Sequence, residues 1–375
     1  MTPADLAFEF PQPEDFVYLN HAGVSPWPRR AALAVQRFAE ENILFGPLHY
    51  ERWLETEQRL RDQLRSLINA ASTDEIALLK NTSEGLSFVA GGLSWSRGDN
   101  IVTCDQEFPS NRIPWQALSE RGVTLREVAL PPDGDLESAL VAACDRHTRL
   151  LTISSVQFAS GYRVDLDALG AFCRARGVLF CIDAIQGLGA LPLDVTTCHA
   201  DFVVADAHKW LLGPEGIALF YVAERVWDRL RPSEYGWHMT ARPGDYDSKT
   251  WRVAGNARRF ECGSPNLLGA HAFSASLSLI QELGIAAISR TVINNTSYLL
   301  DRLENLGAMV LSPGAERRLS GIVSFRPRDG EVATLYRRLR EHGVVCAVRG
   351  GAIRWSPHFY TPRDKLTRAL ALLRS

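Results

Sequence analysis

The stretch VVADAHKWLLGPEG holds a single lysine, Lys209, between an apolar, strand-like run and a glycine-proline turn. Asp183 stands at the carboxyl end of an earlier apolar run, VLFCID. Ligands of open α/β sheets bind outside the carboxyl ends of the strands, so we expect the two side chains to face one pocket. From spacing alone, the pair is either a salt bridge at a strand end or the amine and acid of an active site.

Two other strand ends carry groups that suit a phosphorylated aromatic ligand. Thr82 and Ser83 follow the run IALLK at the start of a helical pattern, where free backbone N–H groups and the helix dipole attract an anion. Taken alone, this is an ordinary helix cap. Phe108 lies in DQEFPSN, where a loop leaves the sheet, and taken alone it is either a core residue or a plate for ring stacking.

Taken together, these residues meet the requirements of pyridoxal phosphate (PLP). The PLP aldehyde reacts with a lysine amine, and a carboxylate keeps its pyridine nitrogen protonated, so the ring can accept electrons from a substrate carbanion. The set predicts a PLP enzyme with Lys209 as its catalytic residue.

The surrounding chain predicts an α/β fold that brings these strand ends together. Short apolar runs alternate with helical patterns, and runs such as VLFCI suit strands covered on both faces, which favours a mostly parallel, seven-stranded type of sheet. After it, GAMVLSP, GIVSFRP, VVCAVR and AIRWSPH predict a smaller C-terminal α+β domain. We place the large domain at residues 16–260 and the small one at 261–375, with residues 1–15 packing on the small one.

Composition excludes several classes of protein. The formal net charge of −2 gives no surface for nucleic acid, and 46% hydrophobic with 22% charged residues is ordinary for a globular protein. Seven scattered cysteines without a CxxC pair argue against a disulfide framework and a metal site. The N-terminus lacks the pattern of a signal peptide and no run is long enough to span a membrane, so we expect a cytoplasmic protein without membrane contact.

The sequence resembles the class V aminotransferases of PLP fold type I, a family that includes cysteine desulfurases, isopenicillin N epimerase-like proteins and kynureninase. The likeness runs from YLNHAGVSP at Tyr18 to IRWSPHFY at Tyr360. Its most specific part is DAIQG followed by DAHKWLLGPEG, which is similar to the family pattern Asp-x-x-Gln and then His-Lys with a Gly-Pro turn.

The resemblance implies a role for each matching residue in cofactor binding. Asp183 would pair with the pyridine nitrogen, Gln186 would contact the ring hydroxyl, Lys209 would bind the aldehyde, and His208 would help to hold the phosphate. The segment KNTSEG would place Thr82 and Ser83 on the phosphate. Phe108 would stack on the ring at a position that is usually histidine in desulfurases. Ser264, in FECGSPN, would reach the phosphate of a second subunit, which implies a homodimer.

The resemblance also suggests residues that bind an amino-acid substrate. Arg354 in IRWSPHFY would grip the α-carboxylate, a bidentate task that suits a guanidinium group. Arg349 would bind a second carboxylate or cap a strand, and His21 would line the pocket or cap a turn.

Three departures from the desulfurase pattern limit this transfer. Asp206 stands where desulfurases usually have a serine on the phosphate, and we expect its carboxylate to turn away or to orient His208. Phe158 replaces an asparagine. Desulfurases carry a nucleophilic cysteine on a loop that is here reduced to Arg349-Gly350-Gly351-Ala352, and Cys346, the nearest thiol, lies in an apolar run typical of a buried, inert cysteine.

These observations predict a cysteine desulfurase-like C–S lyase that acts at the α-carbon of an amino acid without the loop cysteine. The same residues leave open an aminotransferase or an amino-acid epimerase of the family, and a non-catalytic binding protein with the same fold. A nicotinamide dehydrogenase is disfavoured, since GLGALP lacks the third glycine and the helix of a dinucleotide site.

Overall fold

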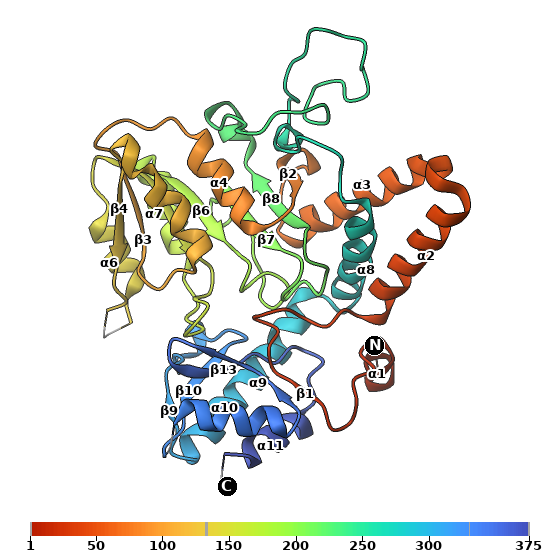
Figure 1. The fold of residues 1–375 in the computed structure, drawn as a ribbon. Helices are drawn as coiled ribbons and strands as arrows, with labels where there is room; N and C mark the ends of the chain where they lie inside the picture. The colour runs from red at the N-terminus through yellow and green to blue at the C-terminus, as the bar shows by residue number, and fades with distance from the viewer. Residues whose placement is uncertain (1, 132–133, 330, 374–375) are drawn as a thin grey trace.

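A computed structural model describes residues 2–131, 134–329 and 331–373. It has two parts, a large α/β unit and a smaller C-terminal unit that lies beside one end of the large sheet (Figure 1).

The large unit is built on a seven-stranded sheet within the described residues. Its order is β2-β8-β7-β6-β5-β3-β4, and β7, β6, β5, β3 and β4 run parallel, while β8 is antiparallel to both β7 and β2. The strands are β2 (Ile76–Leu79), β3 (Asn100–Cys104), β4 (Thr124–Val128), β5 (Thr148–Ser154), β6 (Leu179–Asp183), β7 (Phe202–Asp206) and β8 (Ala218–Val222). All residues of β3, β6, β7 and β8 are buried, because helices cover both faces. The predicted fold class is confirmed.

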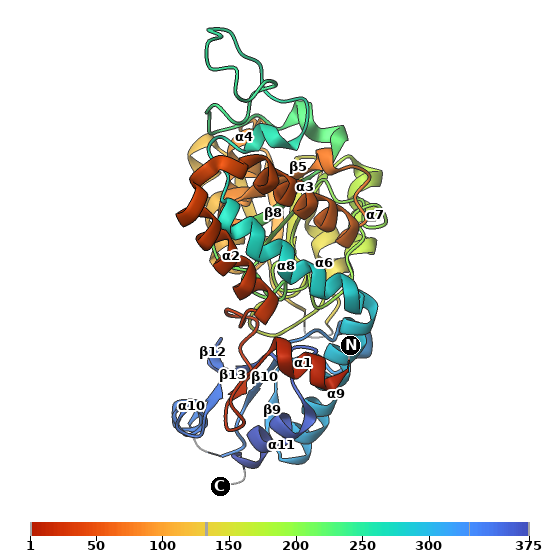
Figure 2. The same ribbon diagram turned by 90° about the vertical axis from the view of Figure 1, so that its right-hand side faces the viewer.

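Helices flank this sheet and close one of its ends. They are α2 (Arg29–Phe45), α3 (Tyr50–Leu67), α4 (Thr82–Gly92), α5 (Ile113–Gln116), α6 (Leu136–Ala143), α7 (Leu166–Arg176) and α8 (Leu267–Leu283). Helices α2, α3 and α8 lie side by side in Figure 2 and pack together beside β2. Helix α3 buries Leu60 and Leu64 as its periodicity predicts, and it also buries Arg61, which pairs with Glu57 and Glu261.

The small unit holds an antiparallel sheet of order β12-β13-β10-β9. Its elements are β9 (Met309–Val310), β10 (Val323–Arg326), β12 (Ala347–Arg349), β13 (Ala352–Trp355), α9 (Ile285–Asn305), α10 (Val332–Glu341) and α11 (Arg363–Ala371). The N-terminal strand β1 (Val17–Tyr18) joins it by pairing in parallel with β11 (Val344–Val345).

The hydrophobic core consists of two clusters, and α9 contributes its first part to one cluster and its later part to the other. Leu277 and Val292 belong to the cluster of the large unit, whereas Leu299 and Leu303 belong to that of the small unit. We propose that the boundary between the domains lies in α9, later than the predicted start of the small domain at residue 261.

The N-terminal segment contacts both units. Helix α1 (Pro3–Glu9) meets α2, where Glu9 pairs with Arg30 at 2.7 Å, and Phe10 stacks on Tyr360 with the ring centroids 3.6 Å apart. Lys365 Nζ of α11 donates to the backbone oxygen of Pro13. Helix α1 thus contacts the large unit and the chain after it contacts the small one, and the assignment of residues 1–15 to the small domain stays a prediction.

In the part of the chain that the structure describes, no single helix is long and apolar enough to cross a membrane. Helices α8 and α9 reach that length and apolarity only as a pair, bent by 83°.

Candidate active site

Lys209 lies in the turn that follows β7, at the carboxyl edge of the sheet. The turn is tight: Leu212 has a φ of 60°, its N–H donates to the backbone oxygen of Lys209 at 3.0 Å, and Gly213 N donates to Ala207 O at 2.8 Å. A Cβ at Gly213 would lie 2.7 Å from that of Ala207, so only glycine fits there. A bulky residue such as Leu212 at positive φ is rare and marks a strained turn, which is common at functional sites.

An aromatic ring faces the amine. The Nζ atom of Lys209 lies 5.6 Å from the centroid of the Phe108 ring, and Phe158 meets that ring edge-on at 5.3 Å between centroids. Phe108 is 40% exposed, so its ring is not part of the core and keeps a face uncovered. The structure thus brings Phe108 beside Lys209, where a stacking plate would be needed.

Asp183 is almost fully buried at the end of β6, and its Oδ1 accepts a hydrogen bond from Ile185 N at 3.0 Å. Burial raises the pKa of this carboxyl, and the nearby Glu107 raises it further, while the Lys209 charge acts in the opposite sense. A cationic partner inside the pocket, such as a protonated pyridine nitrogen, would favour the ionised form of Asp183.

Burial also lowers the pKa of the Lys209 amine. The positive charges of Arg354 and Arg349 lower it further, whereas Asp183 and Asp206 raise it. The amine is therefore closer to its neutral, nucleophilic form at neutral pH than an exposed lysine would be.

Glu107 is a buried carboxylate that the sequence analysis missed. Its oxygens accept hydrogen bonds from Ser154 N at 2.7 Å, Gln157 Nε2 at 2.8 Å and Asn111 Nδ2 at 2.9 Å, and burial raises its pKa. It fastens the loop of Phe108 to the end of β5, next to Asp183 in the sheet register. The available signal was its place directly before Phe108 in DQEFPSN.

The N-terminus of α4 meets the end of β7 through Asp206. Thr82 N donates to Asp206 Oδ1 at 3.2 Å, and Asp206 N donates back to Thr82 Oγ1 at 3.2 Å. Ser83 Oγ donates to Ser110 Oγ at 2.8 Å, which leaves the Ser110 hydroxyl proton for another acceptor. The sequence analysis expected Asp206 either to turn away from the phosphate or to orient His208, and in the structure the free N–H of Thr82 attracts its carboxylate.

Asp206 also lies beside His208, with 3.8 Å between its Oδ2 and His208 Nδ1, which agrees with the alternative expectation that it orients this ring. Burial raises the pKa of Asp206 to about 6, and burial together with the Lys209 charge lowers the pKa of His208 to about 4. Near neutral pH the imidazole is thus a neutral hydrogen-bonding group.

Gln186 faces the N-terminal loop as well as the pocket edge. Its Oε1 accepts a hydrogen bond from Trp210 Nε1 at 3.1 Å, and its Nε2 donates to Ala22 O at 3.0 Å. The second Nε2 hydrogen can still serve a ligand oxygen. The predicted contact with the cofactor hydroxyl stays a prediction.

Arg354 is a buried guanidinium on β13 that makes no ion pair within the described ranges. Its Nη1 donates to Phe158 O at 2.8 Å, while its Nε is buried without a hydrogen-bond partner. Burial and the nearby Arg349 lower its pKa to about 10. Burying an unpaired cation is costly, and an anion bound beside Arg354 would offset that cost. Arg349 is exposed on the same hairpin and donates to Val348 O.

His21 contacts other protein groups through both of its ring nitrogens. Its Nδ1 lies 2.7 Å from Ser356 O and its Nε2 lies 2.6 Å from the Tyr360 hydroxyl, so both ring nitrogens are occupied. Burial lowers its pKa well below the usual value. These contacts join the N-terminal loop to the segment after β13, and the predicted contact of His21 with substrate stays a prediction.

Ser264 lines a cavity with the residues that flank Thr82 and Ser83. It is exposed in the loop before α8 and shares a shallow cavity of about 150 Å³ with Lys80 and Glu84. Its predicted contact with a second subunit stays a prediction. Among the residues that the structure describes, no group of three or more His, Cys, Asp or Glu side chains is placed to hold a metal ion.

Comparison with known proteins decides the family. The family model described as Aminotransferase class-V matches residues 17–359. The chain belongs to the class V aminotransferase family.

Curated relatives of this class V enzyme include desulfurases. A probable cysteine desulfurase of Methanothermobacter thermautotrophicus is 30% identical, with 98% of this chain and 96% of the relative covered. A cysteine desulfurase of Escherichia coli (strain SE11) is 34% identical over 79% of this chain and 73% of the relative. The uncharacterized aminotransferase YcbU of Bacillus subtilis is 28% identical, with 96% of this chain and 94% of the relative covered.

Among solved structures, the cystine C–S lyase C-DES bound to its reaction product cysteine persulfide superposes with a TM-score of 0.89 at 25% identity, covering 97% of this chain and 98% of that one. The apo cysteine desulfurase of Thermococcus onnurineus NA1 superposes with a TM-score of 0.89 at 24% identity, covering 99% of this chain and 97% of that one.

Membership of this family makes the protein a PLP-dependent enzyme with the fold-type I architecture. The residues at the sheet edge fit the cofactor: a largely buried amine of lowered pKa, a buried carboxyl, an uncovered aromatic ring and a helix N-terminus converge there. The buried, unpaired Arg354 fits the carboxylate of an amino acid.

Proposed function

We propose that this enzyme is a cysteine desulfurase-like C–S lyase that releases sulfur without a carrier cysteine. Its substrate is an amino acid with sulfur on the β-carbon. Similarity to the cystine C–S lyase C-DES supports this assignment, because that enzyme was captured with cysteine persulfide as its product. Sulfur that leaves as a small persulfide needs no thiol on the protein.

The observation that carries this proposal is the hairpin between β12 and β13. Arg349 pairs with Ala352, and only Gly350 and Gly351 connect the strands, with φ angles of 55° and 70°. Two consecutive glycines with positive φ make a two-residue hairpin turn, the shortest common connection between antiparallel strands. Such a turn cannot carry a mobile nucleophile over the substrate.

Cys346 does not replace a loop cysteine. It is 5% exposed, and burial raises its thiol pKa to about 12. A thiol of this kind is almost entirely protonated at neutral pH and is a poor nucleophile. Cys346 is therefore poorly suited to carry sulfur as a nucleophile.

PLP, when bound, supplies an electron sink for the carbanion formed at the α-carbon. Lys209 and Asp183 would hold its aldehyde carbon and pyridine nitrogen, and Thr82, Ser83 and His208 would hold its phosphate. Arg354 would bind the substrate carboxylate and orient the α-proton toward the Lys209 amine, which removes it. Loss of this proton sets up cleavage of the bond between Cβ and sulfur, in which sulfur leaves with the electron pair.

For cystine the proposed overall reaction consumes one water and yields cysteine persulfide, pyruvate and ammonia. The Phe108 ring cannot accept or donate a proton, so Lys209 is the proton-transfer group nearest to the reacting atoms. Electrostatic stabilisation of the α-carbanion is the main contribution of the protein.

Incubation of the PLP-loaded enzyme with L-cystine and L-cysteine tests the proposal. With L-cystine we expect pyruvate and a cyanolysable persulfide in equal amounts, and with L-cysteine pyruvate and sulfide in equal amounts. Cys346→Ser should retain both activities. Loss of activity in Cys346→Ser without loss of folded protein would contradict a lyase that needs no carrier cysteine.

Aminotransferase and epimerase chemistry use the same lysine and form the alternative proposals. Conversion of the cofactor to its pyridoxamine form without pyruvate would identify an aminotransferase. Racemised amino acid without pyruvate would identify an epimerase. The family assignment disfavours a non-catalytic binding protein.

We also propose that the active unit is a homodimer. Near the end of α2 the chain exposes a run of apolar side chains, namely Ile43 (83%), Leu44 (70%), Phe45 (52%) and Leu48 (70%). Contiguous apolar surface of this kind marks an interaction site. We expect Leu44→Glu with Leu48→Glu to sediment as a monomer, whereas the unchanged protein sediments as a dimer.

The seven free cysteines favour a cytoplasmic location.

A further inference from the structure

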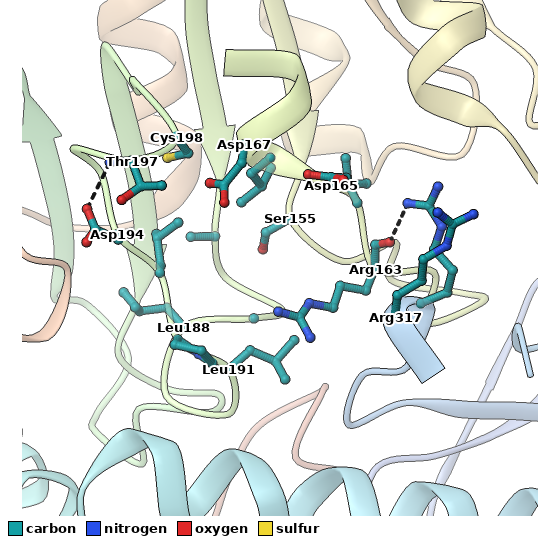
Figure 3. Close-up of a pocket in the computed structure, with 17 residues that line it drawn as sticks. Ser155, Arg163, Asp165, Asp167, Leu188, Leu191, Asp194, Thr197, Cys198 and Arg317 are labelled. Carbon is teal, nitrogen blue, oxygen red and sulfur yellow. Dashed lines mark hydrogen bonds between the residues drawn. The ribbon is translucent and has the colours of Figure 1, made fainter. Parts of the chain in front are cut away.

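Another cavity, of about 440 Å³, is lined in part by the turn that follows β6 (Figure 3). Its walls are the connection from β5 to α7, the turn at 184–194 and the short helix η7 (Glu316–Arg318). None of the residues assigned above to PLP or substrate lines it. The cavity is therefore distinct from the site at Lys209.

Ser155 supplies an unsatisfied hydroxyl to this cavity. Its backbone N–H donates to Asp183 O at 2.9 Å, but its Oγ is buried without a hydrogen-bond partner. Figure 3 shows this oxygen in the middle of the pocket. A Cβ on Gly187 would lie 2.8 Å from the same oxygen, so the glycine keeps the space in front of it open. A buried hydroxyl in this position calls for a ligand partner.

Arg163 supplies an unpaired cation beside it. Its guanidinium extends into the cavity, below Ser155 in Figure 3 and next to Leu191. Within the described residues this side chain has neither an ion pair nor a hydrogen bond, although its backbone bonds to Arg318. Partial burial lowers its pKa, which reflects the cost of the unpaired charge.

None of the neighbouring carboxylates that the structure describes forms an ion pair with Arg163, although the charges of Asp165 and Asp167 act against the lowering of its pKa. Arg318 is paired with Glu137 by two bonds of 2.6 and 2.7 Å. Asp165 accepts from Ala168 N as the cap of α7, and Asp194 accepts from Thr196 N, Thr197 N and Asn69 Nδ2. Asp167 and Arg317 are exposed at the rim. Among the lining residues that the structure describes, the interior thus offers the Arg163 guanidinium and the Ser155 hydroxyl without hydrogen-bond partners.

We propose that this cavity binds the carboxylate of a small organic acid, with Arg163 and Ser155 as its polar contacts. The walls beside them are apolar, formed by Leu188 and Leu191, which are buried. The ligand is therefore a monocarboxylate with a short branched or straight hydrocarbon chain. A guanidinium and a hydroxyl together match the two oxygens of a carboxylate.

Calorimetric titration of the PLP-loaded enzyme tests this with 4-methylpentanoate and with 4-methylpentanamide, which has the same shape but no charge. We expect the acid to bind at least about tenfold more tightly than the amide, since hydrogen bonds to charged groups contribute about 1.5–3 kcal/mol. Arg163→Met, which keeps the aliphatic stem, should weaken acid binding about tenfold or more, and Ser155→Ala should weaken it less. Both variants should keep the activity at Lys209.

Arg354→Met is the matched control, because it removes a buried guanidinium from the other site and should leave acid binding unchanged. Equal binding of acid and amide, or unchanged binding in Arg163→Met, would overturn the proposal. Loss of binding in Arg354→Met would also overturn it, since the acid would then occupy the site at Lys209. If Arg163→Met fails to fold, the proposal is tested by the difference in affinity between acid and amide and by the affinity of Ser155→Ala for the acid.

Discussion

The side-chain amine of Lys209 lies 5.6 Å from the ring centroid of Phe108, while Phe158 holds that ring edge-on. The lysine and the ring come from loops after two different strands, and both face the same edge of the sheet. A planar cofactor bound to the amine would lie against an apolar ring that takes no part in proton transfer.

Replacing Phe108 should therefore weaken cofactor binding without changing the acid-base chemistry. We expect Phe108→Ala to raise the Kd for PLP by about two- to tenfold, because an aromatic pair contributes about 0.5–1.5 kcal/mol. Phe108→Tyr, which keeps the stacking plane, is the control. Fluorescence titration of the apo enzyme measures both constants, and equal Kd values for Phe108→Ala and the unchanged enzyme would show that the ring does not stack.

Arg354 should contribute to substrate binding more than any other arginine of the hairpin. We expect Arg354→Met to raise KM about ten- to a hundredfold, because charge-assisted hydrogen bonds contribute about 1.5–3 kcal/mol. Arg349→Met, at an exposed position, should have a smaller effect. Steady-state kinetics on both variants checks this, and a larger KM change in Arg349→Met would reverse the assignment.

Asp206 should oppose the phosphate of PLP when it is ionised. Its pKa of about 6 is raised in the folded protein, so its contribution to stability is present at low pH and is lost as pH rises through about 6. Asp206→Asn keeps an acceptor for Thr82 N but carries no charge. We expect the apo form of this variant to gain stability over the unchanged protein as pH rises from about 4 to about 6, by up to about 3 kcal/mol.

Urea unfolding at several pH values measures this gain. The same variant should bind PLP more tightly at pH 8, whereas the difference should shrink at pH 5, where Asp206 is largely protonated. A difference in PLP affinity that does not change with pH would mean that the Asp206 charge does not act on the phosphate.

PLP uptake should report the lowered pKa of Lys209. Only the neutral amine attacks the aldehyde, so we expect the uptake rate to rise about tenfold per pH unit and then to level off well below the ordinary lysine pKa of about 10.4. Because the charge of Arg354 lowers this pKa, Arg354→Met should move the plateau to higher pH. Stopped-flow absorbance follows uptake, and Lys209→Ala is the control that should show no lysine-bound PLP.

Much of the fold is determined by local sequence. The runs IALLK, IVTCD and DFVVAD form the strands that they predict, because a strand buried on both faces needs continuous apolar residues wherever it lies in the chain. Lys209 and Asp183 were predicted as functional residues for a related reason. Asp183 ends one such run and Lys209 closely follows another, and few other residue types could do the chemistry of an amine and an acid. The hairpin at Gly350 and Gly351 could also be predicted from the sequence, since its turn requires glycine.

Other features depend on contacts between distant segments, which no local pattern encodes. Asp206 meets Thr82 across 124 residues, and His21 meets Ser356 across 335. The sequence analysis left two alternatives open for each of these side chains, because their distant partners were unknown. Glu107 was not predicted, because its hydrogen-bond partners come from other segments of the chain. The cavity of Arg163 and Ser155 was not predicted either, since burial without a partner becomes visible only when every neighbour is in place. The sequence alone determined which residues can do chemistry, and the tertiary structure decided which of them are satisfied by the protein and which are left to bind a ligand, because that depends on the complete set of surrounding atoms.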